Sequence, residues 1–257
     1  APPDDPRWAW LSRGAMEAML AFVARAKNSK FALRVAAYEF RLDRFADALK
    51  AAIDRGVDVQ VMFDANHNPP DSKGEIFPRD HNLAAASAAG ITKAHQVERI
   101  TRSDVKTPPI SHHKFIVLLR NDKPQAVLTG STNFSKGGVF GQSNVLHIVE
   151  NPRVAQEYLN CWTLISQNPD HGELRQQLSE LNDIPAEKPR IGTTCIFSPQ
   201  SNDNALKWYA KRAASAEDAL FMTFAFGMNA LFKDAYRSGH AALRYALMED
   251  LLAPGVR

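Results

Sequence analysis

The 257-residue sequence has few cysteines and no long apolar run, and both absences exclude classes of protein. No stretch approaches the roughly 18 to 20 apolar residues that span a membrane. The opening residues APPDDPRWAW lack the basic-then-apolar pattern of a signal peptide. The two cysteines, Cys161 and Cys195, have no CxxC spacing and are too few for a disulfide scaffold or a zinc knuckle. We therefore expect two free thiols in a soluble protein, with the cytoplasm as the default compartment.

A strong excess of one charge is also lacking. The chain has 31 Lys and Arg against 28 Asp and Glu, a net charge of +3. That balance is far from the basic stripe of a dedicated nucleic-acid binder, and it permits a phosphate-bearing substrate without requiring one. With 45% hydrophobic residues the chain can fill one large core or two modest ones.

Alternating and periodic apolar residues predict an α/β fold. Residues 31–38 form an apolar run typical of a buried strand, residues 43–53 carry a helical apolar stripe, and residues 57–63 alternate strictly. Strand, helix and strand within about 33 residues indicate a right-handed crossover unit. The polar stretch from residue 64 to residue 109, broken by prolines, predicts a long connection with one short helix.

Further strands are predicted at residues 115–119, 126–129 and 145–149, before a helix opened by Pro152. His147, within the apolar segment VLHIV, is expected to be a core histidine.

The end of the sequence resembles its beginning. Residues NALKWYAKRAASAEDALFMTFAF match EAMLAFVARAKNSKFALRVAAYEF in order and type, with Ala32 aligned to Ala219 and Val35 to Met222. We expect one nearly complete domain at residues 8–168, a linker at 169–190, and the beginning of a second copy at 191–257. On this prediction the chain is an excerpt of a longer protein.

One stretch concentrates polar groups suited to chemistry at phosphorus. Alternation at the start of a strand puts His112 and Lys114 on one face of the sheet, and the loop after the next strand carries Ser131 and Asn133. A nucleophile, an ammonium, a hydroxyl and an amide at one place suit attack on a phosphodiester and the charge on its oxygens. The stretch has no carboxylate or His/Cys cluster with metal-ligand spacing, so no metal is expected.

At these residues the sequence resembles the phospholipase D superfamily. The family's signature, His-any-Lys followed by Gly-Ser/Thr-any-Asn, reads HHK at 112–114 and GSTN at 130–133. The resemblance extends from about Trp10, through RGVDV at 55–59, to FSP at 197–199. It implies an α/β/α sandwich with a mixed β-sheet.

Two positions depart from the family's pattern. The motif Asp expected four residues after the lysine is replaced by Leu119, which leaves open whether Asp122 substitutes for it. Where family members often place an acidic residue behind the nucleophilic histidine, this chain has Gln142, Ser143 and Asn144. Amides can orient an imidazole, but they stabilise an imidazolium less than a carboxylate does.

The resemblance implies a two-step displacement through a phosphohistidine, without metal or other cofactor. His112 would be the nucleophile or the acid, and Lys114 and Asn133 would bind phosphate. Further substrate-binding residues implied by the motif are Gly130, Ser131, Gln142 and Asn144. No second HxK is present in the chain, so the second half-site is expected from a C-terminal continuation or from a homodimer.

Three functions remain open from sequence. A phosphodiesterase acting on a phospholipid head group is favoured, because of the overall pattern and the two-copy plan. The alternative of a metal-independent nuclease acting on DNA or RNA draws on basic residues at 93–106. The third is a catalytically inactive half-site module that binds phosphate, suggested by Leu119 and the missing second motif.

Overall fold

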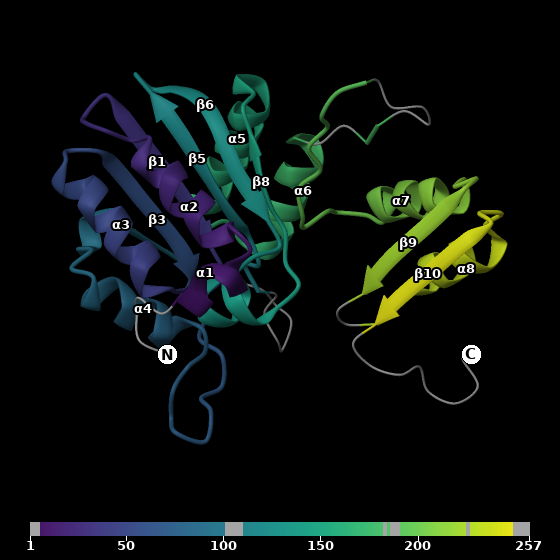
Figure 1. Cartoon of the computed structure of the whole chain (residues 1–257), viewed down its shortest axis with the longest axis horizontal. Coiled ribbons are helices and arrows are strands. Elements are labelled where there is room, and N and C mark those ends of the chain that lie inside the picture. Colours follow the sequence, from purple (N-terminus) through teal and green to yellow (C-terminus); the bar gives the residue numbers. More distant parts are fainter. Residues whose placement is uncertain (1–5, 101–109, 182–183, 186–190, 225–226, 249–257) are drawn as a thin grey trace. The chain divides into compact units, whose positions relative to one another are not determined.

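A six-stranded mixed sheet, in the order β4-β3-β1-β5-β6-β8, organises the first part of the chain (Figure 1). In this computed structural model the described residues are 6–100, 110–181, 184–185, 191–224 and 227–248. Strand β1 is parallel to β3, which is parallel to β4; β5 is antiparallel to β1 and β6, and β8 is antiparallel to β6. The strands are β1 (Phe31–Ala37), β3 (Asp58–Asp64), β4 (Gln96–Arg99), β5 (Lys114–Arg120), β6 (Lys123–Gly130) and β8 (Leu146–Val149).

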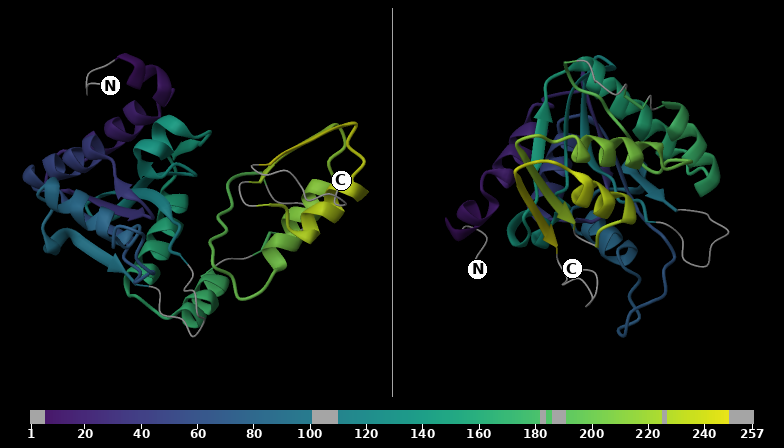
Figure 2. Two further views of the ribbon diagram at one scale, coloured as in Figure 1. Left: turned by 90° about the horizontal axis from the view of Figure 1, so that it is seen from below. Right: turned by 90° about the vertical axis from the view of Figure 1, so that its right-hand side faces the viewer.

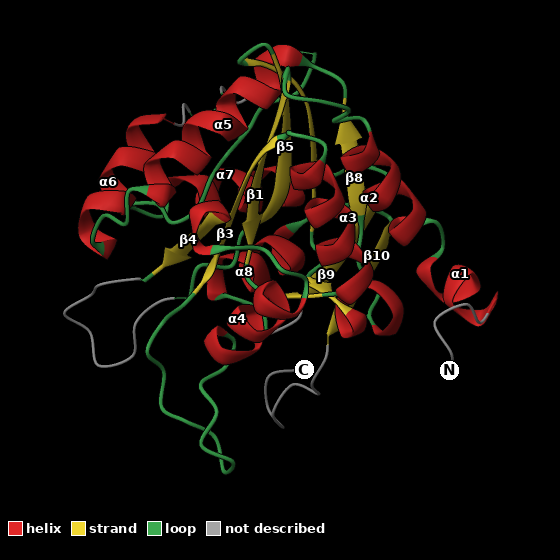
Figure 3. Cartoon of the chain, turned by 90° about the vertical axis from the view of Figure 1, so that its left-hand side faces the viewer, coloured by secondary structure: helices red, strands yellow, loops and turns green. Residues whose placement is uncertain are grey.

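Helices cover both faces of this sheet, as Figure 3 shows. Helices α2 (Ala15–Ala24) and α3 (Asp43–Asp54) share one buried cluster with the β1 side chains of Leu33 and Val35. Helix α5 (Pro152–Ser166) covers the other face, where the indole N–H of Trp162 donates to the Val35 carbonyl at 2.9 Å. The α/β/α sandwich predicted from the sequence is confirmed.

The remaining elements of the first unit connect the strands or flank the sheet. The crossover from β1 to β3 runs through α3, and it closes at Gly56, whose φ of +81° is the left-handed conformation that glycine adopts without strain. The remaining elements of this unit are α1 (Pro6–Ser12), β2 (Phe40–Arg41), α4 (Arg79–Ala88), η1 (Lys93–His95), β7 (Phe134–Ser135), the π-helical turn η2 (Gly137–Gly141) and α6 (His171–Leu181).

Two sequence expectations are corrected here. The stretch at 64–109 contains a strand, β4, which pairs with β3 and whose buried Arg99 binds Asn168 and the carbonyl of Pro169. Its sequence, QVER, has a single apolar residue because it lies at the sheet edge, so no alternation marks it. His147 is exposed, since β8 forms the opposite edge and has a partner strand on one side only.

The chain divides into two compact units after residue 181. Helix α6 belongs to the first, because Leu174 and Leu178 are buried and the helix packs on α5. The first unit therefore runs 13 residues past residue 168, where the sequence analysis ended the first domain.

The second unit has the same order of elements, helix, strand, helix and strand, as α2, β1, α3 and β3 of the first. It consists of α7 (Asn204–Ala214), β9 (Ala219–Phe224), α8 (Ala230–Ser238) and β10 (Leu243–Met248), with β9 and β10 parallel and α7 packed on α8 (Figure 2). Ala219 pairs with Leu243 as Ala32 pairs with Asp58. Phe221 and Tyr245 stack at 5.9 Å on the uncovered face of this strand pair, 68% and 61% exposed.

The turn of the β5–β6 hairpin resolves one open question. Asn121 and Asp122 form it, with φ values of +48° and +60°. Six residues of β5, 115–120, separate this turn from the HxK segment, a distance of about 20 Å along the strand. Asp122 is exposed in this turn, whereas the position of the motif Asp is buried, so Asp122 does not occupy the place of the missing carboxylate. Leu119, 5% exposed, fills the core opposite Ala32.

Candidate active site

The antiparallel course of β5 brings the two sequence motifs to the same end of the sheet. Ala37 at the end of β1 pairs with Lys114 at the start of β5, and Phe115 pairs with Thr129 near the end of β6. The HxK segment therefore lies between the residues that follow β1 and those that follow β6. Alternation correctly predicted this meeting of strand ends.

Lys114 is a buried cation. It is 7% exposed, and its ammonium donates to the backbone carbonyl of His112 at 2.8 Å and lies 5.3 Å from the ring centroid of Tyr38. Burial lowers the pKa of Lys114 to about 8, against an opposing effect of the Glu39 carboxylate. The side chain is thus predominantly charged at pH 7.

The His112 ring packs on the same tyrosine. The two ring centroids lie 4.6 Å apart at an interplanar angle of 61°. Burial lowers the pKa of His112, the charge of Lys114 lowers it further, and Glu39 opposes both. A neutral imidazole has an unprotonated nitrogen with a lone pair, which is the form that attacks phosphorus. His113 is half-buried and lies 6.3 Å from Phe115, a residue that packs on Tyr158 of α5.

The side chains that follow β6 are hydrogen-bonded to one another and to the backbone of the same loop. The Ser131 hydroxyl donates to Asn144 Oδ1 at 2.9 Å and accepts from the backbone N–H of Val145 at 3.1 Å. The Asn144 amide donates to the Gly138 carbonyl and to Gln142 Oε1. The three expected substrate-binding residues that have side chains, Ser131, Gln142 and Asn144, are therefore joined to each other, and they fix the shape of the GSTN loop.

Two glycines allow the close approach of the backbone in this loop. A Cβ on Gly130 would lie 2.0 Å from the carbonyl oxygen of Val145, and a Cβ on Gly138 would lie 2.4 Å from that of Asn133. Asn133 Oδ1 is buried without a hydrogen-bond partner in the described part of the chain. The Asn133 amide is held by packing and keeps hydrogen-bonding capacity for a ligand.

The two motifs meet through backbone pairing. Among the described residues, no hydrogen bond links the side chains of His112 or Lys114 to those of Ser131 or Asn133. A ligand bound between the HxK side chains and the GSTN side chains would have to bridge the two motifs.

Sequence reasoning missed Tyr38 and Glu39, which follow β1 beside the HxK motif. Tyr38 follows β1 and contacts His112 and Lys114. Glu39 is 9% exposed and forms an ion pair with Arg41 at 2.9 Å. Their position after a strand's carboxyl end, where ligands gather in α/β sheets, is a signal that could have identified them.

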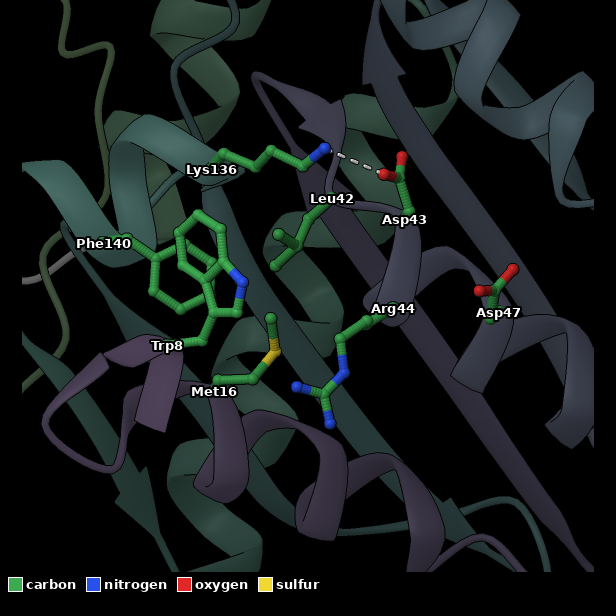
Figure 4. Close-up of a pocket in the computed structure, with 8 residues that line it drawn as sticks. All are labelled: Trp8, Met16, Leu42, Asp43, Arg44, Asp47, Lys136 and Phe140. Carbon is green, nitrogen blue, oxygen red and sulfur yellow. Dashed lines mark ion pairs between the residues drawn. The ribbon is translucent and has the colours of Figure 1, made fainter. Parts of the chain in front are cut away.

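The lining of the cavity drawn in Figure 4 includes Lys136 and Phe140, which follow the GSTN motif in the sequence. The cavity has a volume of about 270 Å³, with the rings of Trp8 and Phe140 4.8 Å apart on one wall and Lys136 paired with Asp43 at 3.1 Å. Its lining includes neither His112 nor Lys114.

Comparison with known proteins identifies the family. Residues 22–162 match the family model described as "Cardiolipin synthase, PLD-like domain". That match covers more than half of the chain, and the chain belongs to this family of phospholipase D-like domains, part of a phosphodiesterase superfamily. A search of curated protein sequences gave no match.

Three solved structures resemble the chain. Nuc from Salmonella typhimurium, a phospholipase D family member, is 27% identical over 60% of this chain and 88% of its own, with a TM-score of 0.42. NucT from Helicobacter pylori is 16% identical over 62% and 91%, with a TM-score of 0.43. Polyphosphate kinase from Porphyromonas gingivalis is 14% identical over 92% and 36%, with a TM-score of 0.51, a likeness of fold alone.

The described ranges contain no candidate membrane span and no candidate metal cluster. No helix there has the length and apolar character needed to cross a bilayer. No group of three or more His, Cys, Asp or Glu side chains within those ranges is arranged to hold a metal ion. Cys161 is buried and Cys195 is partly buried, both as thiols.

Proposed function

We propose that the chain hydrolyses or transfers a phosphodiester through a phosphohistidine formed on His112. The observation that carries this proposal is the packing of the His112 imidazole and the buried Lys114 ammonium on the same Tyr38 ring. A neutral imidazole supplies the nucleophile, and the ammonium attracts and neutralises an anionic phosphate. The side-chain N–H group of Asn133, across the site, would donate to another phosphoryl oxygen.

The reaction has two displacements. In the first, a ring nitrogen of His112 forms a bond to phosphorus while the bond to the leaving alcohol breaks, and a general acid gives that alcohol its proton. In the second, water or another alcohol attacks phosphorus and loses its proton to the same group, now a base, while the bond to His112 breaks. The acid would be the histidine of a second half-site, from a second copy of the chain or from another part of a longer protein.

The favoured substrate is a phospholipid, cleaved at its head group. The description of the matching family names a cardiolipin synthase, an enzyme of lipid phosphodiesters. Nucleic acid is the alternative substrate; its sequence support was the basic stretch at 93–106, of which residues 101–106 lie outside the described residues.

A paired assay with His112→Ala tests the proposal. The full chain is incubated in EDTA with mixed phospholipid vesicles and, separately, with DNA and RNA. We expect head-group release that His112→Ala lowers by at least about 1,000-fold, as the loss of a nucleophile does, while His113→Ala keeps activity within a few-fold. Nucleic-acid cleavage alone, with the same dependence on His112, would assign the alternative substrate. No turnover of any substrate and no phosphate trapped on His112 would refute the proposal in favour of an inactive phosphate-binding module.

Protein concentration tests the source of the second half-site. If a second copy supplies the acid, specific activity rises with protein concentration in step with the dimer population measured by light scattering. Constant specific activity of a monomer would refute the homodimer.

A further inference from the structure

Glu39 lies in the turn after β1, and the backbone groups on both sides of it are hydrogen-bonded to Asn82. The buried side chain of Asn82 donates to the Tyr38 carbonyl at 2.9 Å and accepts from the Phe40 N–H at 2.7 Å. These bonds fix the backbone on both sides of Glu39. The Glu39 carboxylate is fixed in turn by Arg41, whose Nε and Nη2 both reach Oε2, at 3.0 and 2.9 Å.

Glu39 also adjoins the GSTN loop. Strand β2 pairs in parallel with β7, with Phe40 opposite Phe134 and Arg41 opposite Ser135. One step back along this register, Glu39 comes into line with Asn133. The same turn therefore borders the basic side chains of one motif and the amide of the other.

The charges around Glu39 come from several elements. Tyr38 contacts His112 and Lys114, and it also packs 6.3 Å from Phe77, which connects the turn to the neighbouring loop. The titratable and charged groups that surround the turn are Tyr38, Arg41, Asp64, Glu75, His81, His112 and Lys114.

Of these groups, Glu39 is the carboxylate that acts on both basic residues. Its charge raises the pKa of His112 and that of Lys114 against the effect of burial. Asp64, buried and bonded to the Ser111 N–H at 2.8 Å, acts on Tyr38 instead. The positions where related motifs have acids are filled by Leu119 and by the amides of Gln142 and Asn144.

We propose that Glu39 is a positioning residue of the HxK motif, whose fixed negative charge keeps Lys114 cationic and stabilises positive charge on His112 during the reaction. This role rests on the proposed function, because it assigns the carboxylate that the same site needs. The Glu39 carboxylate comes from the turn after β1, a position that belongs to neither the HxK nor the GSTN motif. Arg41 holds the carboxylate in place and limits its effect.

Titrations of the two basic side chains by NMR test this role without relying on turnover. In Glu39→Gln we expect the pKa of Lys114 to fall by about one unit from about 8, and the pKa of His112 to fall as well. The alkaline limb of the pH–rate profile should move down with Lys114. Glu150→Gln is the matched control, since it breaks an exposed Glu–Arg pair, to Arg25, and should leave both titrations unchanged.

Arg41→Gln provides a test with the opposite sign. It keeps Glu39 but removes the neutralising guanidinium, so the pKa values of His112 and Lys114 should rise. If Glu39→Gln does not fold, Arg41→Gln still tests the role of Glu39. Titrations in either folded variant that match the Glu150→Gln control would overturn the role of Glu39. If the titrations shift but the wild-type chain turns over no phosphodiester, the proposed function fails and the electrostatic role stands.

Discussion

The side-chain amide of Asn82 donates at 2.9 Å to the backbone carbonyl of Tyr38, the residue on which both basic side chains of the site rest. The same amide donates to the Asp64 carbonyl at 3.0 Å, and its oxygen accepts from the Phe40 N–H. Asn82 is fully buried. One side chain of α4 thus joins the ends of β1, β2 and β3 beneath the site.

Replacing Asn82 should therefore destabilise the first unit. Asn82→Leu leaves three backbone groups buried without partners, at a cost of about 3 kcal/mol. Urea denaturation measures the loss. Asn160→Ala, on the exposed side of α5, should change the free energy of unfolding by less than about 0.5 kcal/mol; an equal loss in both variants would contradict the role of Asn82.

Lys114 should lower stability while serving the site. Its pKa falls from 10.5 in the ordinary state to about 8 in the fold, so burial disfavours the charged form by about 3 kcal/mol. Lys114→Met removes that charge and also the bond to His112, and we expect a net gain of about 2 kcal/mol at pH 7. Between pH 8 and 10.5 Lys114 is protonated in the unfolded chain but neutral in the folded chain. The wild-type free energy of unfolding therefore rises over this pH range, and the advantage of Lys114→Met shrinks. A gain independent of pH would exclude charge burial as its cause.

Affinity for anions should decline in alkaline solution. A phosphodiester keeps its single charge from pH 6 to 10, so a change in its Kd reports the protein. As Lys114 loses its proton near pH 8, we expect Kd to rise by up to about tenfold per pH unit. Lys114→Arg keeps the positive charge, and its Kd should stay flat over this range. A wild-type Kd that stays level through pH 9 would contradict this expectation.

Two adjacent glycines provide a matched pair for the GSTN loop. Gly138→Ala places a methyl group against the Asn133 backbone, while the same change at Gly137 meets open space. We expect Gly138→Ala to cost about 1 to 3 kcal/mol and to lower phosphodiester turnover at least tenfold. Gly137→Ala should stay near wild type in both measurements. Equal behaviour of the two variants would show that close packing does not position Asn133.

The sequence predicted the elements that have strong periodicity. Strands β1 and β3 and helix α3 follow from their apolar patterns, and the pairing of β5 with β6 brings the HxK segment and the GSTN loop to one end of the sheet. That their side chains form one site stays a prediction. Strand β4 was missed because an edge strand with polar residues carries no alternation. His147 was wrongly assigned to the core because apolar neighbours do not reveal that β8 lies at an edge.

Glu39 could not be predicted from motif spacing. Its relation to Lys114 depends on the register of β1 against β5, and its relation to Asn133 depends on the two-residue pairing of β2 with β7. Neither pairing follows from local periodicity. The stacking of Phe221 on Tyr245 in the second unit likewise needed the register of β9 against β10.

The hairpin turn at Asn121 and Asp122 gives the first unit a convenient place for a label. It projects from the end of the sheet opposite His112, about 20 Å away along β5. A cysteine at position 122 could carry a fluorophore that reports tumbling, assembly or vesicle attachment by anisotropy. Since the dye would lie far from the phosphate-binding end, the labelled chain could be assayed and imaged in the same sample.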